Sequence, residues 1–343
     1  MTISYPEADA MLGEALYPDE AATAQQIADA IAAGLEAAHP NGGAPRDAHP
    51  KAHGLQRAEF RVRPDLPPQF ATGVFVPGKT YQAYLRFSNG NGDPTRADDN
   101  DDGRGLAIKL LGVPGDKAFE PERTATTQDF ILINYPMFFI NEPHKYLSLV
   151  HKAGSKSAFV KATIPFAIGL KSVGLFKKTS TGKIANPLQV RYYSATPYQL
   201  GLGPDRIAIK FSVVPASDHV DELPANPSHD YLREAMAATL RAGEVTLKFL
   251  IQPRTSEKLS VEDSMTAWDE ADAPFHEVAT IAIPKQDFDT PELNALAENL
   301  SFNPWHCLPE HRPLGAPNRM RKVIYDRISA TRHRLNAVER REP

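Results

Sequence analysis

Residues 80–113, TYQAYLRFSNGNGDPTRADDNDDGRGLAIKLLGV, contain two strand-like segments separated by an acidic turn. The segments 80–88 and 105–113 are rich in residues that favour β-structure, and alternation of apolar with polar residues is typical of strands that bury one face. Five aspartates lie within residues 93–102. Their spacing lacks the glutamate and the register of an EF-hand loop, so a solvated acidic turn is the favoured interpretation over a calcium site.

Outward from this stretch, the chain predicts a sheet surrounded by helices. Eight strand-like segments can close into an antiparallel barrel, which leaves no exposed edge. The fold class is therefore α+β, an eight-stranded antiparallel β-barrel with helices packed outside it. Two regions are expected: an N-terminal helical segment and linker over 1–45, and the barrel with a C-terminal helix over 46–343. The remaining expected strands are 57–63, 129–135, 190–196, 206–215, 244–253 and 276–284, and helical stretches are expected over 20–38, 144–178, 228–242, 291–299 and around Tyr325.

Composition and charge narrow the class of protein. The 343 residues carry a net charge of −4, with a pI of about 6.3, so nothing indicates binding to nucleic acid or an anionic membrane. The single cysteine, Cys307, excludes an internal disulfide and a cysteine-rich metal site, and it favours a reducing, cytoplasmic compartment. The most apolar stretch, 158–176, is interrupted by Lys161, Pro165 and Lys171. We therefore expect no transmembrane span, and the N-terminus shows no secretion signal.

A stripe of polar side chains marks the segment 318–336, NRMRKVIYDRISATRHRLN. On a helix of about 3.6 residues per turn, Arg321, Tyr325 and Arg332 project from one face. A free tyrosine, with a pKa of about 10, is neutral at pH 7. A neighbouring arginine favours the phenolate, and tyrosinate is a ligand of ferric iron in one class of haem enzyme. The alternative is a basic helix with one aromatic anchor.

A second candidate lies in residues 44–54, APRDAHPKAHG, just before the first expected strand. His49 and His53 have the i, i+4 spacing of zinc ligands, but Pro50 disfavours a regular helix between them. One of these histidines could instead act as a general base over a bound oxidant, because its pKa lies near working pH. The third alternative is that both histidines are exposed in a loop and have no functional role.

Two further polar residues lie in or beside apolar strands. Arg86 is inside the strand 80–88 and points either into the barrel or away from it. An inward arginine needs a partner, which a carboxylate-bearing cofactor would supply. Asn134 ends an apolar strand and precedes the aromatic pair Phe138 and Phe139. A buried asparagine must be hydrogen-bonded, so Asn134 would orient the group to which it bonds. The alternative is that Asn134 forms a turn ahead of Pro136.

In this order, the motifs resemble those of the haem catalases. RDAHPK (46–51), YLRFSNGNG (84–92), DDGRGLAIKL (101–110), NYPMFFINEPHKY (134–146) and LSFNPW (300–305), followed by RKVIY (321–325) and TRHRLN (331–336), occur in the family's sequence order. The resemblance runs from about Arg46 to Leu335 and is patchy between 150 and 300. Each motif is weakly specific by itself, and their collinear order carries the resemblance.

The resemblance implies a role for each matching residue. Tyr325 would ligate the iron of haem b, with Arg321 bonded to its phenolate. His49 would be the distal histidine, contacted by Ser88, and Asn134 the distal asparagine. The residues that would meet the propionates or the ring of the haem are Arg46, Arg86, Arg332, Phe138 and Tyr146.

The chain also departs from the family pattern. The stretch between His49 and the first strand is one residue longer than usual, which makes His53 an extra candidate, and a single asparagine, Asn134, replaces the usual pair. A phenylalanine of typical catalases is replaced by Tyr146. The chain is much shorter than ordinary catalases and resembles the minimal catalase-related haemoproteins. We expect neither the long arm that threads a neighbouring subunit, nor the C-terminal helical domain, nor an NADPH site.

The implied function is a haem-dependent peroxidase or catalase that acts on hydrogen peroxide or organic hydroperoxides. Its expected partners are a peroxide and a small organic or lipid co-substrate, and a homo-oligomer remains an open alternative. A second interpretation is rearrangement of fatty-acid hydroperoxides to allene oxides, with 158–176 as a lipid route. A third is a barrel that binds haem or lipid without turnover.

Overall fold

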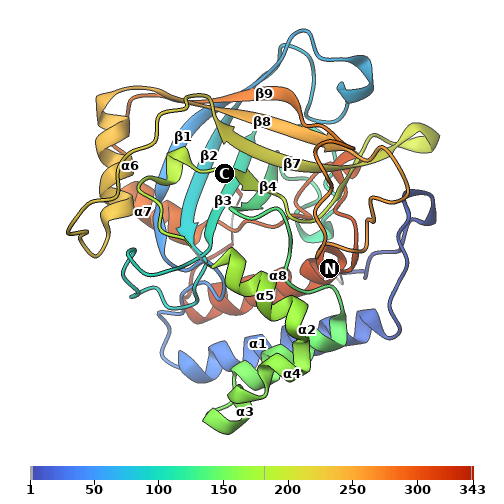
Figure 1. Cartoon of the computed structure of the whole chain (residues 1–343), viewed down its shortest axis with the longest axis vertical. Coiled ribbons are helices and arrows are strands. Elements are labelled where there is room, and N and C mark those ends of the chain that lie inside the picture. The colour runs from blue at the N-terminus through green and yellow to red at the C-terminus, as the bar shows by residue number, and fades with distance from the viewer. Residues whose placement is uncertain (1–2, 181, 341) are drawn as a thin grey trace.

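One antiparallel sheet of nine strands forms the centre of the computed structural model, which describes residues 3–180, 182–340 and 342–343 (Figure 1). Eight of the strands close into a barrel, because β5 pairs with β4 on one side and with β7 on the other. The ring is completed by β1, which pairs with both β2 and β9. The predicted eight-stranded barrel is therefore confirmed. The strands are β1 Ala52–Val62, β2 Thr80–Asn89, β3 Arg104–Leu111, β4 Thr127–Ile133, β5 Tyr192–Tyr193, β6 Tyr198–Leu200, β7 Ile207–Pro215, β8 Val245–Pro253 and β9 His276–Ile283.

The ninth strand, β6, was not predicted. It pairs with β7 at Tyr198↔Ile209, farther along the same edge that β5 uses. Between β5 and β6, Ala195 has a φ of 58° and Pro197 follows, so the backbone cannot continue as one regular strand. The sequence predicted one strand over 190–196; the structure has the two-residue β5 there and a second short strand, β6, beyond the predicted range.

The barrel interior is a packed core. Phe130 of β4 lies 4.9 Å from Phe249 of β8 and 5.1 Å from Phe211 of β7, measured between ring centroids. Phe60 of β1 lies 5.1 Å from Phe249, and all four rings are buried. Because strand side chains alternate between faces, these rings determine which residues point outward. A ligand therefore has to bind outside the barrel wall.

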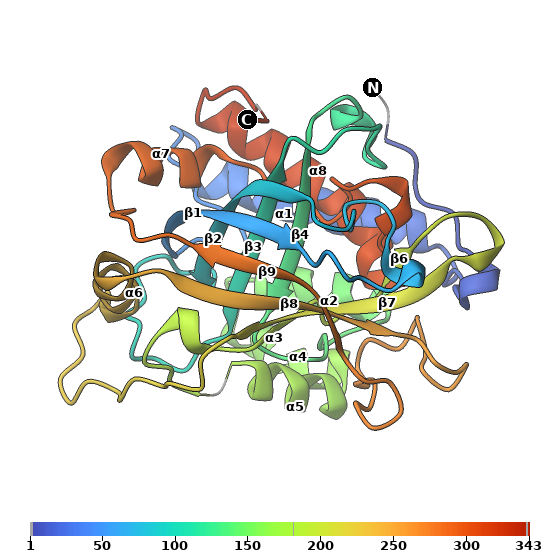
Figure 2. The same cartoon turned by 90° about the horizontal axis from the view of Figure 1, so that it is seen from above.

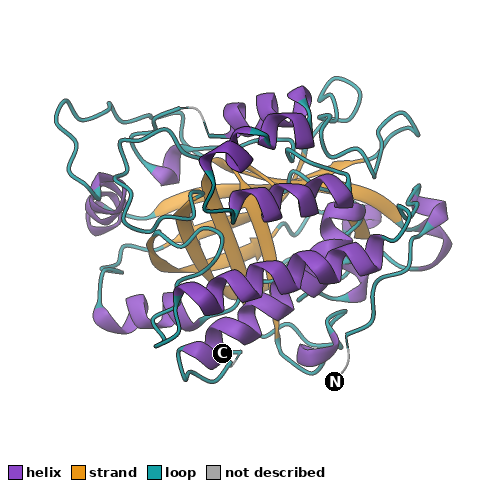
Figure 3. Cartoon of the chain, turned by 90° about the horizontal axis from the view of Figure 1, so that it is seen from below, coloured by secondary structure: helices purple, strands orange, loops and turns teal. Residues whose placement is uncertain are grey.

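The helices form a layer against the outside of the barrel (Figure 3). The helices α1 and α8 pack against each other, and α2 contacts both. Figures 1 and 2 place α6 and α7 at one end of the barrel. The α-helices are α1 Glu20–Ala38, α2 Pro143–Ala153, α3 Ala158–Ala162, α4 Ile164–Ile168, α5 Leu170–Thr179, α6 Tyr231–Ala242, α7 Pro291–Asn299 and α8 Ala316–Leu335. Short 3-10 turns occur at Ala10–Leu12, Pro68–Phe70, Glu120–Glu122, Pro187–Gln189, Gly203–Asp205 and Pro309–His311.

The helical stretch predicted over 144–178 is broken into four helices. Gly154 ends α2, and Pro165 lies in the first turn of α4, where its missing N–H costs no helical hydrogen bond. Gly169 has a φ of 86° between α4 and α5, a conformation that glycine adopts without a steric penalty. The predicted helices over 20–38 and 291–299 have the same bounds as α1 and α7.

A buried ionic cluster attaches α8 to the N-terminal segment. Arg319 is fully buried and donates to Glu14 at 2.7 Å, to Glu20 at 2.6 Å and to Glu262 at 2.7 Å. Burial alone would lower the pKa of Arg319, but its hydrogen bonds to Glu20 and Glu262 raise it. The cluster joins three segments that are distant in sequence, residues 14–20, Glu262 and the first turn of α8. It therefore fixes where α8 begins against the rest of the molecule.

We expect Arg319→Ala to destabilise the protein by about 3–5 kcal/mol, because it leaves the buried carboxylate of Glu20 without its counter-charge. The control is Arg327→Ala on the same helix, whose pair with Asp29 is exposed and contributes only about 0–1 kcal/mol. Urea unfolding of both variants measures the difference. Equal losses of unfolding free energy would contradict the assigned role of Arg319.

Candidate functional site

The candidate site lies between the outer face of β2 and the helical layer. Leu85 and Phe87 point into the barrel, so Arg86 and Ser88 point outward. Both outward side chains are nevertheless buried, at 4% and 3% exposure, because other parts of the chain cover this face. The sequence left open whether Arg86 points into the barrel or away from it, and the structure shows that it points away.

His49 lies against the outward face of β2 and β3. Its Nδ1 is 3.1 Å from Ser88 Oγ, and its carbonyl accepts a hydrogen bond of 3.0 Å from Arg86 Nη2. Gly105 makes room for the imidazole, because a Cβ there would lie 2.5 Å from Nδ1. Burial, followed by the charges of Arg86 and Arg321, lowers the pKa of His49 to about 4. The ring is therefore neutral at physiological pH and can accept a proton.

Tyr325 of α8 lies in a group of aromatic and cationic side chains. The Arg321 guanidinium carbon is 5.9 Å from the centroid of the Tyr325 ring and 5.0 Å from that of Phe138. Arg321 Nη1 donates to Asn318 Oδ1 at 3.1 Å. Tyr146 of α2 belongs to the same group, since burial and the nearby acidic groups Asp47 and Tyr325 raise its pKa.

Three buried arginines meet beside His49. Burial, then the charges of Arg86 and Arg332, holds the pKa of Arg46 well below its usual value. Burial lowers the pKa of Arg86 to about 10, with Arg332 adding to the effect. The negative charge of Glu298, which pairs with Arg332, partly offsets the lowering of the pKa of Arg46 and of Arg86. The Nε atoms of all three arginines are buried without a hydrogen-bond partner among the described residues. Such groups are costly unless an anion satisfies them.

Asn134 lies where β4 ends beside β3. Its Oδ1 accepts a hydrogen bond of 2.8 Å from the backbone N–H of Arg104, and its own N–H donates to the Arg104 carbonyl at 2.9 Å. The side chain is thus held by the backbone through its oxygen. The amide nitrogen is the group that remains to contact a ligand.

His53, the extra histidine, belongs to a different network. Its Nε2 is 2.8 Å from Asn89 Oδ1, and it is buried at 1% exposure. Asn89 Nδ2 donates to Asp98, which also pairs with Lys51 at 2.8 Å. The predicted solvated acidic turn is therefore wrong at Asp98, which is fully buried. The sequence could not reveal this, because the partners of Asp98 come from other segments.

Gly105, Glu298 and Tyr198 are parts of the site that the sequence analysis missed. Tyr198 has a buried Oη without a partner among the described residues, and the charges of Arg321 and Tyr325 act on it. Side chains alternate between the two faces of the strand 105–113, so residue 105 lies on the same face of the sheet as Lys109. This alternation could have indicated from the sequence which face Gly105 occupies. Glu298 and Tyr198 gave no local signal.

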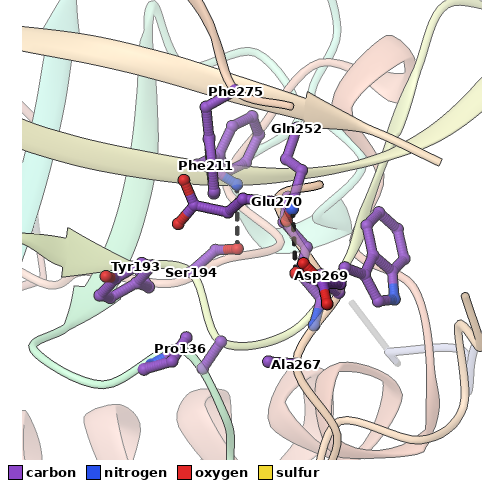
Figure 4. Close-up of a pocket in the computed structure, with 12 residues that line it drawn as sticks. Pro136, Tyr193, Ser194, Phe211, Gln252, Ala267, Asp269, Glu270 and Phe275 are labelled. Carbon is purple, nitrogen blue, oxygen red and sulfur yellow. Dashed lines mark hydrogen bonds between the residues drawn. The ribbon is translucent and has the colours of Figure 1, made fainter. Parts of the chain in front are cut away.

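A cavity of about 370 Å³ lies elsewhere on the barrel (Figure 4). Figure 4 shows Gln252 and Phe211 beside it, where Gln252 Nε2 donates to the Trp268 carbonyl at 3.1 Å and the Phe211 N–H donates to Ser194 Oγ at 3.1 Å. Lys210 Nζ is buried 4.9 Å from the Trp268 ring centroid, and burial lowers the pKa of Lys210 to about 8. None of the predicted site residues lines this cavity.

One group of potential metal ligands occurs among the described residues, formed by Glu122, His306 and Glu342. Lys109 Nζ is 2.6 Å from Glu342 Oε2 and 2.7 Å from Asp129 Oδ1. The position of a cation is therefore already taken by an ammonium group, and the group does not need a metal.

Comparison with known proteins identifies the fold. The family model described as Catalase matches residues 44–161, which include His49, Arg86, Ser88 and Asn134. The matched segment and the likeness in fold both support the resemblance to catalases that the sequence motifs indicate.

Three solved structures illustrate the likeness. A fungal catalase is 20% identical with a TM-score of 0.65, and a bacterial catalase is 18% identical with a TM-score of 0.68. Catalase A from Saccharomyces cerevisiae is 20% identical with a TM-score of 0.64. The alignments cover 84–85% of this chain but only 58–61% of those chains. No curated protein has a significant sequence match. Within the described ranges, no helix is long and apolar enough to cross a bilayer.

We expect His49 to titrate near pH 4 in the folded protein, and Arg86→Gln to raise its pKa by removing a nearby positive charge. Histidine-labelled NMR spectra over a pH series measure both values, and His49→Gln identifies the resonance. Arg63→Gln, at an exposed and distant position, is the control. An unchanged pKa in Arg86→Gln would contradict the electrostatic assignment.

Proposed function

We propose that this chain is a haem-dependent oxidoreductase that consumes hydrogen peroxide or organic hydroperoxides, with Tyr325 as the ligand of the haem iron. The catalase fold and the matched segment support the class of chemistry. The residues that gather around β2 and α8 support haem as the cofactor.

The arginine trio of Arg46, Arg86 and Arg332 carries the proposal. These guanidinium groups come from three distant parts of the chain, are held close together, and keep unsatisfied N–H groups at their Nε atoms. A ligand with two carboxylates would satisfy these donors and relieve the repulsion, and guanidinium groups match carboxylates in geometry. Haem b has two propionates. Arg332 lies seven residues beyond Tyr325 on α8, so a propionate contact and iron ligation can come from one helix.

The residues proposed to hold the haem have different chemistry. Tyr325 would supply a hard oxygen ligand, and the positive charge of Arg321 beside its ring favours the phenolate. When bound, a ferric haem would supply the redox chemistry of peroxide cleavage, as in other tyrosinate-ligated haem enzymes. Phe138 offers an aromatic face, and the nearby guanidinium of Arg321 orients it.

His49 is the proposed acid–base group. When Nδ1 donates to Ser88 Oγ, Nε2 carries the lone pair and can take a proton from a peroxide. The protonated ring can then return that proton to the leaving oxygen. Its low pKa keeps the ring neutral before the reaction and makes it a ready donor afterwards. Asn134, held through its oxygen, is proposed to orient the peroxide with its amide nitrogen.

Rearrangement of a fatty-acid hydroperoxide is the second candidate. It uses the same site, and one observation favours a lipid substrate: Phe159, Phe166 and Leu170 of the apolar stretch 158–176 are 81–90% exposed instead of packed against the barrel. The test is product analysis with a polyunsaturated fatty-acid hydroperoxide. An epoxide or its hydrolysis products, formed without a reductant, indicate rearrangement.

We expect the protein reconstituted with hemin to show a high-spin ferric spectrum, and Tyr325→Phe to lose that spectrum because the phenolate is removed. Absorption and magnetic circular dichroism spectra measure this. Tyr84→Phe, on the outward face of β2, is the control. A Soret band that is the same in wild type and Tyr325→Phe would sink the assignment.

Removal of one arginine should weaken haem retention. Each charge-assisted hydrogen bond to a propionate contributes roughly 1.5–3 kcal/mol, so Arg86→Met should lose haem about 10–100 times faster to an acceptor protein. Hemin dimethyl ester lacks the negative charges, and its loss should be nearly the same from wild type and variant. An equal effect of the substitution on both cofactors would argue against propionate binding.

His49→Ala should slow peroxide consumption by about 10²–10⁴-fold, the usual contribution of a positioned acid–base group, while leaving the hemin spectrum in place. Peroxide decay at matched haem content is the measurement. Unchanged decay would show that the barrel binds haem without using this residue in turnover, the outcome expected of a binding protein.

A further inference from the structure

Residues 143–183 have an unusual charge pattern for this chain. They contain eight lysines and no aspartate or glutamate, although the whole chain has a net charge of −4. Two of these lysines pair with carboxylates from outside the range, Lys145 with Glu142 and Lys171 with Asp263. No carboxylate of the described residues pairs with Lys156, Lys161 or Lys178. The segment is therefore strongly basic on a chain that is acidic elsewhere.

The same segment exposes large apolar side chains. The exposed fractions are 81% for Phe159, 90% for Phe166, 85% for Leu170 and 55% for Phe176. These four residues lie within 18 positions, and they are four of the ten large apolar side chains that are exposed among the described residues. Contiguous exposed apolar residues bordered by charges mark an interaction surface.

The local backbone places these side chains on an outer surface. The helices α3, α4 and α5 are short, and the turns at Gly154, Thr163 and Gly169 separate them. Figure 1 shows α3 and α4 at the end of the molecule away from the barrel strands. None of these helices is long enough to cross a bilayer, so any contact of this surface with a membrane would be interfacial.

The inner side of this segment borders the candidate site. Phe176 lies 5.4 Å from Phe139, which lies 4.9 Å from Phe138, measured between ring centroids. Arg321 then lies over the Phe138 ring. The exposed surface and the candidate site are thus connected through three aromatic side chains.

We propose that α3, α4 and α5 form a docking surface for an anionic lipid bilayer, with the apolar side chains inserted among the acyl chains and the lysines at the headgroups. Lysine-rich surfaces with inserted aromatic and aliphatic side chains bind anionic membranes in this way. A second copy of the chain is a poorer occupant, because a two-fold contact would bring the same lysines together. The proposal is independent of the redox activity, since lipid binding requires no haem.

The test is co-sedimentation of the purified full-length chain with two kinds of vesicle. One contains phosphatidylcholine alone, and the other contains phosphatidylcholine with phosphatidylglycerol. We expect binding to the anionic vesicles, little binding to the neutral ones, and weaker binding as salt is raised.

Two variants separate the apolar and the basic contributions. Phe159→Ser/Phe166→Ser/Leu170→Ser should weaken binding to anionic vesicles at least tenfold, because three inserted side chains are lost. Lys156→Glu/Lys161→Glu/Lys178→Glu should abolish the preference for anionic over neutral vesicles, since each lysine contributes about fivefold near such a surface.

Leu202→Ser/Val220→Ser/Leu223→Ser is the matched control, because it removes exposed apolar side chains elsewhere. Its vesicle binding should equal that of the wild type, and circular dichroism checks the fold of every variant. Failure of the wild type to bind anionic vesicles, or unchanged binding of both patch variants, would overturn the proposal. Self-association without lipid that the patch variants abolish would also overturn it and would assign the surface to a second copy.

Discussion

The position of α8 is the constraint on which the candidate site depends. This helix carries Arg321, Tyr325 and Arg332, and none of them can meet the residues of β2 unless the helix lies against the barrel at one particular level. Arg319, fully buried among three carboxylates, sets that level. An ion pair of this kind adds little net stability against a well-packed apolar alternative, but breaking it is costly. Its main effect is therefore to exclude other placements of the helix.

Several features of the site are unfavourable for an empty protein. Three buried guanidinium groups repel one another, and their Nε atoms have no partner among the described residues. Gly105, the second residue of β3, has no side chain to pack, and this lets His49 lie against the sheet. Costs of this kind concentrate where a ligand compensates for them. The proposed haem would supply two carboxylates to the arginines and an aromatic surface beside Phe138.

Two faces of the helical layer have opposite characters. The inner face of α2 brings Tyr146 toward Tyr325, while the outer faces of α3–α5 expose phenylalanines and lysines. The net charge of −4 is a sum over the whole chain and does not reveal a local basic surface. A binding partner responds to the charges within about a Debye length, 10 Å, of its contact.

Much of the fold could be read from periodicity. The alternation of side chains predicted the eight barrel strands, and helical spacing predicted α1 and α7 with their observed bounds. The division of the segment 190–200 into β5 and β6 was missed, because the left-handed conformation of Ala195 depends on its surroundings.

For the candidate site, the sequence identified residue types and their order along the chain, and the family resemblance suggested their roles. Only the tertiary structure decided that Arg86 points outward, that Asp98 is buried, and that Arg46, Arg86 and Arg332 meet. The physical reason is that periodicity records which face of an element is buried. Which distant charges share that buried space is determined by how the elements pack, and no single segment contains that information.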